Sequence, residues 1–235
     1  MTDFSTSFAG LKLANPIIIS SSGLTKTADK VARLAEAGAG AVVLKSLFEE
    51  QIMHETGKAL EENAHDHAEG MEYISAYVRQ QTIQDYLDVI RKSKKACDIP
   101  VIASINCHSD AEWVNFARDI EMAGADAIEV NILSLQTGTN YEWGSFEKEH
   151  VKILRHLKQT VKIPVIMKLG NCFTNPVALV SQLKANGADA VVLFNRFFPF
   201  DIDIEHLTTS AGHILGCASD LSNPLRWAGI ISGKV

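Results

Sequence analysis

One arrangement of hydrophobic and polar positions occurs three times along this chain. Each copy has a Gly-containing turn, then a short apolar run, then a polar residue. The copies are 36–45, 123–134 and 185–195, and their apolar runs end at Lys45, Asn131 and Asn195. A glycine followed by an apolar run is typical of a helix that closes and leads into a buried parallel strand. The pattern predicts repeated helix–strand units of an α/β fold.

Further segments extend this series. Strands are predicted at 17–19, 41–44, 99–105, 127–134, 163–167 and 190–195. Helices are predicted at 27–37, 82–96, 111–122, 146–160 and 176–185, with a final helix opening at Asn223-Pro224. Residues 4–14 predict a hairpin that turns at Ala9-Gly10. A long charged connection is expected over 48–81 and an irregular segment from 196 to about 221.

These elements make six strand–helix units, whereas a closed (β/α)8 barrel has eight. The predicted fold is therefore α/β, of the (β/α)8 TIM-barrel type, with an N-terminal β-hairpin and without the last two β/α units. We expect one domain over residues 1–235.

Composition narrows the function classes. The chain has 235 residues, a hydrophobic content of 46% and a net charge of −6. The acidic balance argues against nucleic acid as a partner. No apolar run approaches the roughly 20 residues that span a bilayer, and no signal peptide is visible, so no membrane partner is expected. Four scattered cysteines indicate a reduced, cytoplasmic setting.

The connection over 48–81 contains His65 and His67, whose spacing suits metal chelation only in an extended segment with a third ligand. The sequence offers no such ligand, so no metal site is expected and a solvated loop is favoured. A connection this long commonly covers a site.

Polar side chains follow the predicted strands at their carboxyl ends, where barrel sites are built. They are Ser22, Lys45, Asn106, Asn131, Ser134, Lys168 and Asn195. Two lysines and three amides suit a planar heterocycle with carbonyl and ring-nitrogen acceptors, and could stabilise negative charge on it. The backbone of the Ser20–Gly23 turn could approach a ligand closely, or this turn could simply cap the next helix. Lys45 could meet a ligand oxygen or reach solvent at the barrel mouth.

Several segments together resemble the dihydroorotate dehydrogenase family of FMN-dependent barrels. They are 8–16 (FAGLKLANP), Ser22-Gly23, 38–46 (GAGAVVLKS), Glu129-Val130-Asn131, 164–168 (PVIMK) and Asn195. The resemblance covers nearly the whole chain in order.

The resemblance implies FMN as cofactor and a dihydroorotate-like small molecule as substrate. It places the flavin against the backbone of Ser21, Ser22 and Gly23. The ring contacts that it implies are Lys45, Ser46, Asn106, Asn131, Lys168 and Asn195. The implied catalytic residues are Ser134, Lys45 and Asn131, with Ser134 as the base that removes a proton while hydride passes to the flavin. A homodimer is among the assemblies expected.

The chain departs from the family pattern at four places. Leu135-Gln136 stands where the family has proline and a second substrate asparagine, and Arg196 stands where a serine follows the strand-six asparagine. The substrate loop of the family is not recognisable in 60–80. The glycine-rich turns that grip the FMN phosphate have no counterpart before Val235. We therefore expect the ring contacts to be retained and the substrate contacts to be partly rewritten.

Three other functions are compatible with the residues. The chain could be a non-catalytic truncated barrel that associates through its open edge without flavin. It could be a Schiff-base aldolase that uses Lys168. A tRNA-modifying flavin barrel is the least favoured, because the chain lacks a basic footprint.

Overall fold

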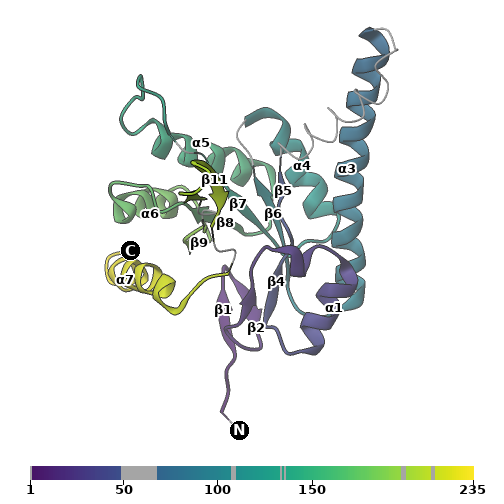
Figure 1. The fold of residues 1–235 in the computed structure, drawn as a ribbon. Coiled ribbons are helices and arrows are strands. Elements are labelled where there is room, and N and C mark those ends of the chain that lie inside the picture. The colour runs from purple at the N-terminus through teal and green to yellow at the C-terminus, as the bar shows by residue number, and fades with distance from the viewer. Residues whose placement is uncertain are drawn as a thin grey trace.

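The computed structural model of the protein describes residues 2–48, 68–106, 110–132, 134, 136–196, 200–212 and 215–235. Its centre is a curled sheet of parallel strands in the order β3-β4-β6-β7-β8-β9, with β5 also paired to β6. The strands are β3 (Ile18–Ile19), β4 (Ala41–Val43), β5 (Leu47–Phe48), β6 (Val101–Asn106), β7 (Ala127–Asn131), β8 (Val165–Leu169) and β9 (Ala190–Leu193). Figure 1 shows the strands of this sheet at the centre of the molecule.

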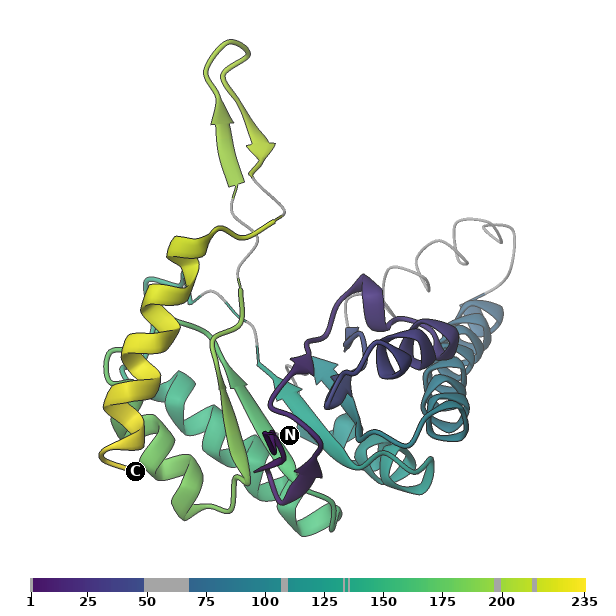
Figure 2. The same cartoon turned by 90° about the horizontal axis from the view of Figure 1, so that it is seen from below.

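Helices lie in an arc outside the sheet, which gives the molecule the form of a half-barrel (Figure 2). They are α1 (Ala28–Glu36), α3 (Ala68–Ala96), α4 (Asp110–Met122), α5 (Ser145–Thr160), α6 (Pro176–Ala185) and α7 (Ser222–Ser232). Short 3-10 turns are η1 (Gly23–Thr25) and η2 (Ala218–Leu221). The predicted series of six strand–helix units is confirmed, and in the described chain the sheet ends at β3 and β9. None of the described helices combines the length and apolar character that crossing a bilayer requires.

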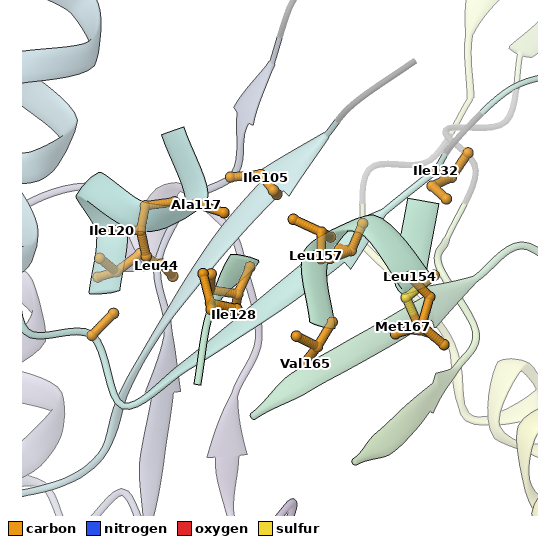
Figure 3. Packing of buried hydrophobic residues seen from close by; sticks show 14 of the residues in the cluster. Leu44, Ile105, Ala117, Ile120, Ile128, Ile132, Leu154, Leu157, Val165 and Met167 are labelled. Carbon is orange, nitrogen blue, oxygen red and sulfur yellow. The ribbon is translucent and has the colours of Figure 1, made fainter. Parts of the chain in front are cut away.

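The two faces of the sheet bury different side chains, because successive residues of a strand point to opposite faces. Ile128, Val130, Val165 and Met167 point outward and pack on α4 and α5, together with Ile120, Leu154 and Leu157. Figure 3 shows this packing between the strands and those helices. The convex face is therefore an apolar core along the whole length of the strands.

The N-terminal hairpin covers part of the other, concave face. Its strands are β1 (Thr6–Phe8) and β2 (Leu11–Leu13), and Ala9 and Gly10 turn with φ of 50° and 78°. Positive φ at both central residues suits a tight hairpin, and the predicted turn is confirmed. Phe8, Ala9 and Leu11 pack on an apolar cluster of Val43, Ile102, Ala127 and Ile166 near the amino ends of the strands.

The three repeated copies share one local structure. Each helix ends at a glycine with positive φ: Gly38 (93°), Gly124 (95°) and Gly187 (94°). In each copy the next N–H bonds back to a helix carbonyl five residues earlier: Ala39 to Leu34, Ala125 to Ile120, and Ala188 to Leu183. This 6→1 bond is the mark of the Schellman motif. The sequence pattern therefore identified a true structural repeat.

An aspartate follows the glycine turn in two of the copies and ties it to an earlier strand. Asp126 Oδ2 accepts the N–H of Val101, the first residue of β6, and pairs with Lys94 of α3. Asp189 Oδ2 likewise accepts the N–H of Val165, which begins β8, and pairs with Lys158 of α5. In the first copy the corresponding residue is Gly40, where a Cβ would overlap the backbone oxygen of Asn15.

The prediction for the connection before the third strand was wrong in part. Helix α3 begins at Ala68, whereas the sequence predicted a loop up to residue 81. Figure 1 shows that this first part of α3 extends past the sheet. In this part of the sequence, polar and charged residues interrupt the apolar positions, and Tyr77 is exposed. Residues 49–67, including His65 and His67, lie outside the described residues.

A second difference lies between β9 and α7. The segment predicted as irregular contains an antiparallel hairpin of β10 (Phe200–Asp203) and β11 (Thr208–Ala211), which projects from the half-barrel (Figure 2). Asp203 Oδ1 accepts the N–H groups of Glu205 and His206 and so stabilises the turn. The alternation of Phe200, Asp201, Ile202 and Asp203 is a strand signal that the sequence reading missed.

Candidate functional site

The concave face changes from apolar to polar along the strands. In β6, β7 and β8 the residues two positions beyond Ile102, Ala127 and Ile166 are Ser104, Glu129 and Lys168. A period of two keeps these side chains on the same face. Asn106 and Asn131 follow as the next pair in register, and Asn131 lies opposite Lys168 on β8. The strands thus place a polar layer above an apolar one.

Hydrogen bonds join this polar layer across the sheet. Ser21 Oγ, after β3, lies 3.0 Å from Ser46 Oγ and accepts the Ser46 N–H at 2.9 Å. Ser46 Oγ lies 2.7 Å from Ser104 Oγ, which donates to Glu129 Oε1 at 3.1 Å. Lys168 Nζ lies 3.5 Å from the same carboxylate oxygen. One chain of polar contacts, the Ser21–Lys168 network, therefore runs from the end of β3 to β8.

Glu129 and Lys168 form a buried ion pair in this network. Their side chains are 3% and 11% exposed. A buried charge is costly unless it is paired and hydrogen-bonded. The carboxylate of Glu129 has two such partners, the ammonium of Lys168 and the hydroxyl of Ser104.

Tyr86 of α3 supports the network from the helix side. Its hydroxyl donates to the carbonyl oxygen of Ser104 at 2.9 Å and accepts the N–H of the same residue at 2.8 Å. Burial raises the pKa of the Tyr86 phenol, and the Glu129 carboxylate acts in the same direction. The phenol therefore stays protonated and fixes the backbone of β6 at this point.

A bulge explains why Ser46 faces the network. Val43 pairs with Ile102 and Leu47 with Ile105. The three residues 44–46 between β4 and β5 therefore lie opposite only two residues of β6, 103–104. An extra residue reverses the alternation of side chains. Ser46 consequently reaches Ser104, while Lys45 lines a cavity of about 250 Å³ with Thr82 and Tyr86 of α3. The structure places Lys45 outside the Ser21–Lys168 network.

The carboxyl ends of the strands form the mouth of the half-barrel. Amide side chains lie at this mouth, above the ion pair. Asn195 donates from Nδ2 to Asn131 Oδ1 at 2.9 Å, and its backbone N–H bonds to Leu169 O at 2.7 Å. Asn106 is 2% exposed, and its buried Oδ1 has no hydrogen-bond partner among the described residues. An acceptor in that state is suited to an N–H group of a ligand.

Three other predicted site residues have local roles in the structure. Ser22 Oγ accepts the N–H of Leu24 and caps η1, and the Ser22 N–H bonds to Thr25 Oγ1. Gly23 begins that 3-10 turn. Ser134 is half-buried, and its Oγ accepts a hydrogen bond from Gln136 Nε2 at 3.0 Å.

A larger cavity of about 820 Å³ opens beside the mouth. It extends from the ends of β8 and β9 to η2 and α7, and it includes Asn171, Asn195, Arg196 and Asp220 in its wall. Arg196 lies 3.8 Å from the Asp220 carboxylate. The cavity and the polar mouth therefore share Asn195.

An aromatic cluster lies behind the β8 end of the sheet. Phe146 stacks on Phe173 with ring centroids 5.5 Å apart, and His150 contacts both rings edge-on. His150 Nδ1 lies 2.7 Å from the carbonyl oxygen of Phe146 and must carry the proton there, since the carbonyl only accepts. Burial lowers the pKa of His150, so the ring is neutral.

Sequence reasoning missed three residues of this site: Ser104, Glu129 and Tyr86. Glu129 carried a usable signal, because a carboxylate in the middle of an apolar strand, two residues before Asn131, must share its face. Ser104 has the same spacing from Asn106. No group of histidine, cysteine, aspartate or glutamate side chains within the described ranges is arranged to hold a metal ion.

Comparison with known proteins adds a family match. Residues 3–212 match the family model described as dihydroorotate dehydrogenase. The chain is 31% identical over 207 residues to dihydroorotate dehydrogenase B (NAD(+)), catalytic subunit, of Thermoplasma volcanium, covering 87% of this chain and 65% of that protein. The protein of the same description from Thermoplasma acidophilum is 29% identical over 224 residues (93% and 72%). NAD-dependent dihydropyrimidine dehydrogenase subunit PreA of Escherichia coli is 26% identical over 211 residues (82% and 48%).

Proposed function

Because the chain belongs to the dihydroorotate dehydrogenase family, we propose that it is an FMN-dependent oxidoreductase that oxidises dihydroorotate or a related cyclic amide. The chain spans 65% of the length of the Thermoplasma volcanium relative and 48% of the Escherichia coli one. The activity is therefore proposed from the site that these residues build. We further propose that residues 1–235 act as one FMN-binding unit.

One observation carries the proposal: the concave face brings a buried lysine and three amides to the same end of the sheet. Lys168 and Asn131 lie opposite each other, Asn131 bonds to Asn195, and Asn106 Oδ1 is buried without a partner among the described residues. A flavin ring presents carbonyl oxygens and one imide N–H along its polar edge. Amide and ammonium donors fit the oxygens, and Asn106 Oδ1 fits the N–H.

The remaining proposed contacts come from the turn after β3 and the link after β4. They are Ser21, Ser22, Gly23 and Ser46, whereas Lys45 lines the cavity beside α3 and would contact a flavin only after its side chain turns toward the concave face. Ser21 and Ser46 already bond to each other, so the turn and the link are held together beside the concave face. This supports a rigid wall for a planar ligand.

FMN, when bound, supplies the hydride acceptor. We propose that Ser134 Oγ removes a proton from the substrate carbon next to the one that loses hydride, while the hydroxyl proton of Ser134 passes to water. Loss of this proton and of the hydride leaves a carbon–carbon double bond in the product. The hydrogen bond from Gln136 Nε2 to Ser134 Oγ directs a lone pair of the hydroxyl away from the amide and stabilises negative charge on the oxygen. Asn131 holds the substrate at the same mouth.

The test is a visible absorption spectrum of the purified protein, recorded after soaking with FMN and desalting. A retained flavin band that bleaches anaerobically with dihydroorotate would support the proposal. Bleaching with dihydrouracil instead would move the substrate toward the dihydropyrimidines, the substrate class in the name of the Escherichia coli relative. The absence of a retained band would contradict the proposal.

Lys168→Met provides the matched test of the site, with Lys12→Met as control. Lys168 lies in the polar layer, whereas Lys12 is exposed on the N-terminal hairpin at the other end of the strands. We expect Lys168→Met to weaken FMN binding at least tenfold and Lys12→Met to leave it unchanged. Equal affinities in the two variants would argue against a flavin over Lys168.

A second candidate function is association through the open sheet without flavin. All four residues of β9 are partly exposed, and Leu225 and Ile230 of α7 are 65% and 38% exposed. Unpaired strand edges and apolar surface favour contact with another chain. Concentration-dependent sedimentation of a protein that binds no flavin would support this candidate. Under the first proposal, the assembly that we propose is a flavin-bound homodimer in the cytoplasm.

A further inference from the structure

The ammonium of Lys168 is held below the mouth and does not face it freely. Lys168 is 9% exposed, and its Nζ lies 3.5 Å from Glu129 Oε1. In the parallel register Glu129 lies opposite Ile166, two residues before Lys168, while Asn131 lies opposite Lys168. A lysine beside an open cavity would otherwise extend its charge toward water. The carboxylate therefore sets where the ammonium lies.

The carboxylate is itself fixed by a directed series of hydroxyls. An ionised carboxylate only accepts hydrogen bonds, so Ser104 Oγ donates to Glu129. The single hydroxyl hydrogen of Ser104 is then used in that bond, so Ser104 Oγ accepts a hydrogen bond from Ser46 Oγ. For the same reason Ser46 Oγ accepts from Ser21 Oγ. All three hydroxyl protons point toward Glu129. Tyr86 holds the backbone of Ser104 on both sides, so the donor cannot drift.

We propose that Glu129 is a positioning residue that holds Lys168 and compensates its charge, so that a ligand at the mouth meets an ion pair and not a free cation. This inference rests on the proposed function, since it assigns a role within the same site. Removing the negative charge of Glu129 should increase the positive potential at the mouth, whereas removing Lys168 should decrease it. Two variants of one buried pair should therefore act in opposite directions.

Glu129→Gln and Lys168→Met test this prediction with sulfite. Sulfite adds to the oxidised flavin and leaves a negative charge on the ring edge, so its affinity reports the potential there. Glutamine keeps the size of the side chain and an oxygen that accepts from Ser104. We expect Glu129→Gln to bind sulfite about tenfold more tightly than the parent and Lys168→Met at least tenfold more weakly. A purely structural role for Glu129 would weaken binding in both variants, and that result would overturn the inference.

A second measurement does not need flavin. Urea unfolding of the apo chain is recorded for the parent, Glu129→Gln, Lys168→Met and the double variant. We expect each single change to leave one charge unpaired and the double change to cost less than the sum of the two. Additive costs would overturn the inference. If Glu129→Gln does not fold, folding of the double variant supports the pair, and failure of both overturns it.

These two measurements separate the inference from the proposed function. A parent chain that binds no FMN contradicts the proposed function, and the unfolding cycle still decides whether Glu129 and Lys168 act as a pair. A parent chain that binds FMN with additive unfolding costs leaves the proposed function standing and removes the role of Glu129.

Discussion

The lower and upper layers of the concave face lie two residues apart along β6, β7 and β8 and three apart at the bulge after β4. Their side chains differ in polarity and in what they contact. The lower layer, Val43, Ile102, Ala127 and Ile166, is apolar and packs on the N-terminal hairpin. The upper layer, Ser46, Ser104, Glu129 and Lys168, has a carboxylate, an ammonium and hydroxyls that satisfy one another. Residues that stabilise the fold and residues that can bind a ligand therefore occupy different positions along the same strand, and each strand contributes to both groups.

The largest effect that tests this separation is expected in the lower layer. Ile166→Ala removes a side chain that is 1% exposed and leaves a cavity beside the hairpin, so it should lower the free energy of unfolding by about 2–5 kcal/mol. Urea unfolding measures the loss. At a temperature where the variant is folded, its FMN affinity should match that of the parent, and a large loss of affinity would break the comparison.

A smaller effect is expected where the upper layer depends on a helix. Tyr86→Phe removes the hydroxyl that bonds to both backbone groups of Ser104, so two buried hydrogen bonds are lost. It should destabilise the chain by about 1–3 kcal/mol. Because the Ser104 hydroxyl also donates to Glu129, FMN affinity should fall with stability. A loss of stability with unchanged FMN affinity would contradict this prediction and would show that the upper layer tolerates movement of β6.

Stability should fall at acid pH because of His150 in the aromatic cluster behind the mouth. The pKa of His150 is lowered by burial, so between its folded pKa and the ordinary value of 6.5 the unfolded chain binds more protons than the folded one. The contribution of His150 to stability is therefore full above pH 6.5 and is lost as the pH falls toward the folded pKa, by at most about 1.4 kcal/mol per pH unit. Urea unfolding at pH 7.5, 6.5 and 5.5 measures it, and His150→Phe should flatten this part of the profile. An unchanged slope in that variant would contradict the prediction.

The smallest effect is expected at the amino ends of the strands, farthest from the chemistry. Asp126→Asn and Asp189→Asn keep an oxygen for the strand N–H and remove a half-exposed ion pair with Lys94 or Lys158. Each should cost about 0.2–1 kcal/mol, and the two values should be similar because each aspartate accepts one strand N–H and pairs with one lysine. Thermal unfolding measures both. Unequal costs would show that the two copies are supported differently.

The elements that the sequence predicted well are those whose apolar pattern is local. The glycine turns, the six parallel strands and the hairpin at Ala9-Gly10 needed only spacing and turn chemistry. Helix α3 was shortened in the prediction because charged residues interrupt its first part, although Met71, Ile74 and Val78 have helical spacing. The β10–β11 hairpin was missed because its alternation is brief and its second strand is polar.

The site was harder to predict, because it depends on which face each side chain takes. The polar residues at the strand ends were found from position alone. The bulge that turns Ser46 inward and Lys45 toward α3 requires the pairing of β4 and β5 with β6, which no single segment contains. Glu129 could have been found from its spacing to Asn131, whereas the two bonds from Tyr86 join residues that are 18 positions apart and have no pattern in common.

Because of Gly40, the turn of one repeated unit cannot be exchanged with the turns of the other two. The units that end in β7 and β9 share a glycine turn and an aspartate anchor, so a designer could exchange their turns and keep both anchors. The unit that ends in β4 does not accept this exchange, because the aspartate would bring a Cβ into the backbone of Asn15. Asn15 in turn accepts from Ile17 and donates to Gly38, so the exit of the hairpin and the entry to β4 are interlocked. Any shuffled or circularly permuted half-barrel built from this chain must carry residues 15–40 as one indivisible block.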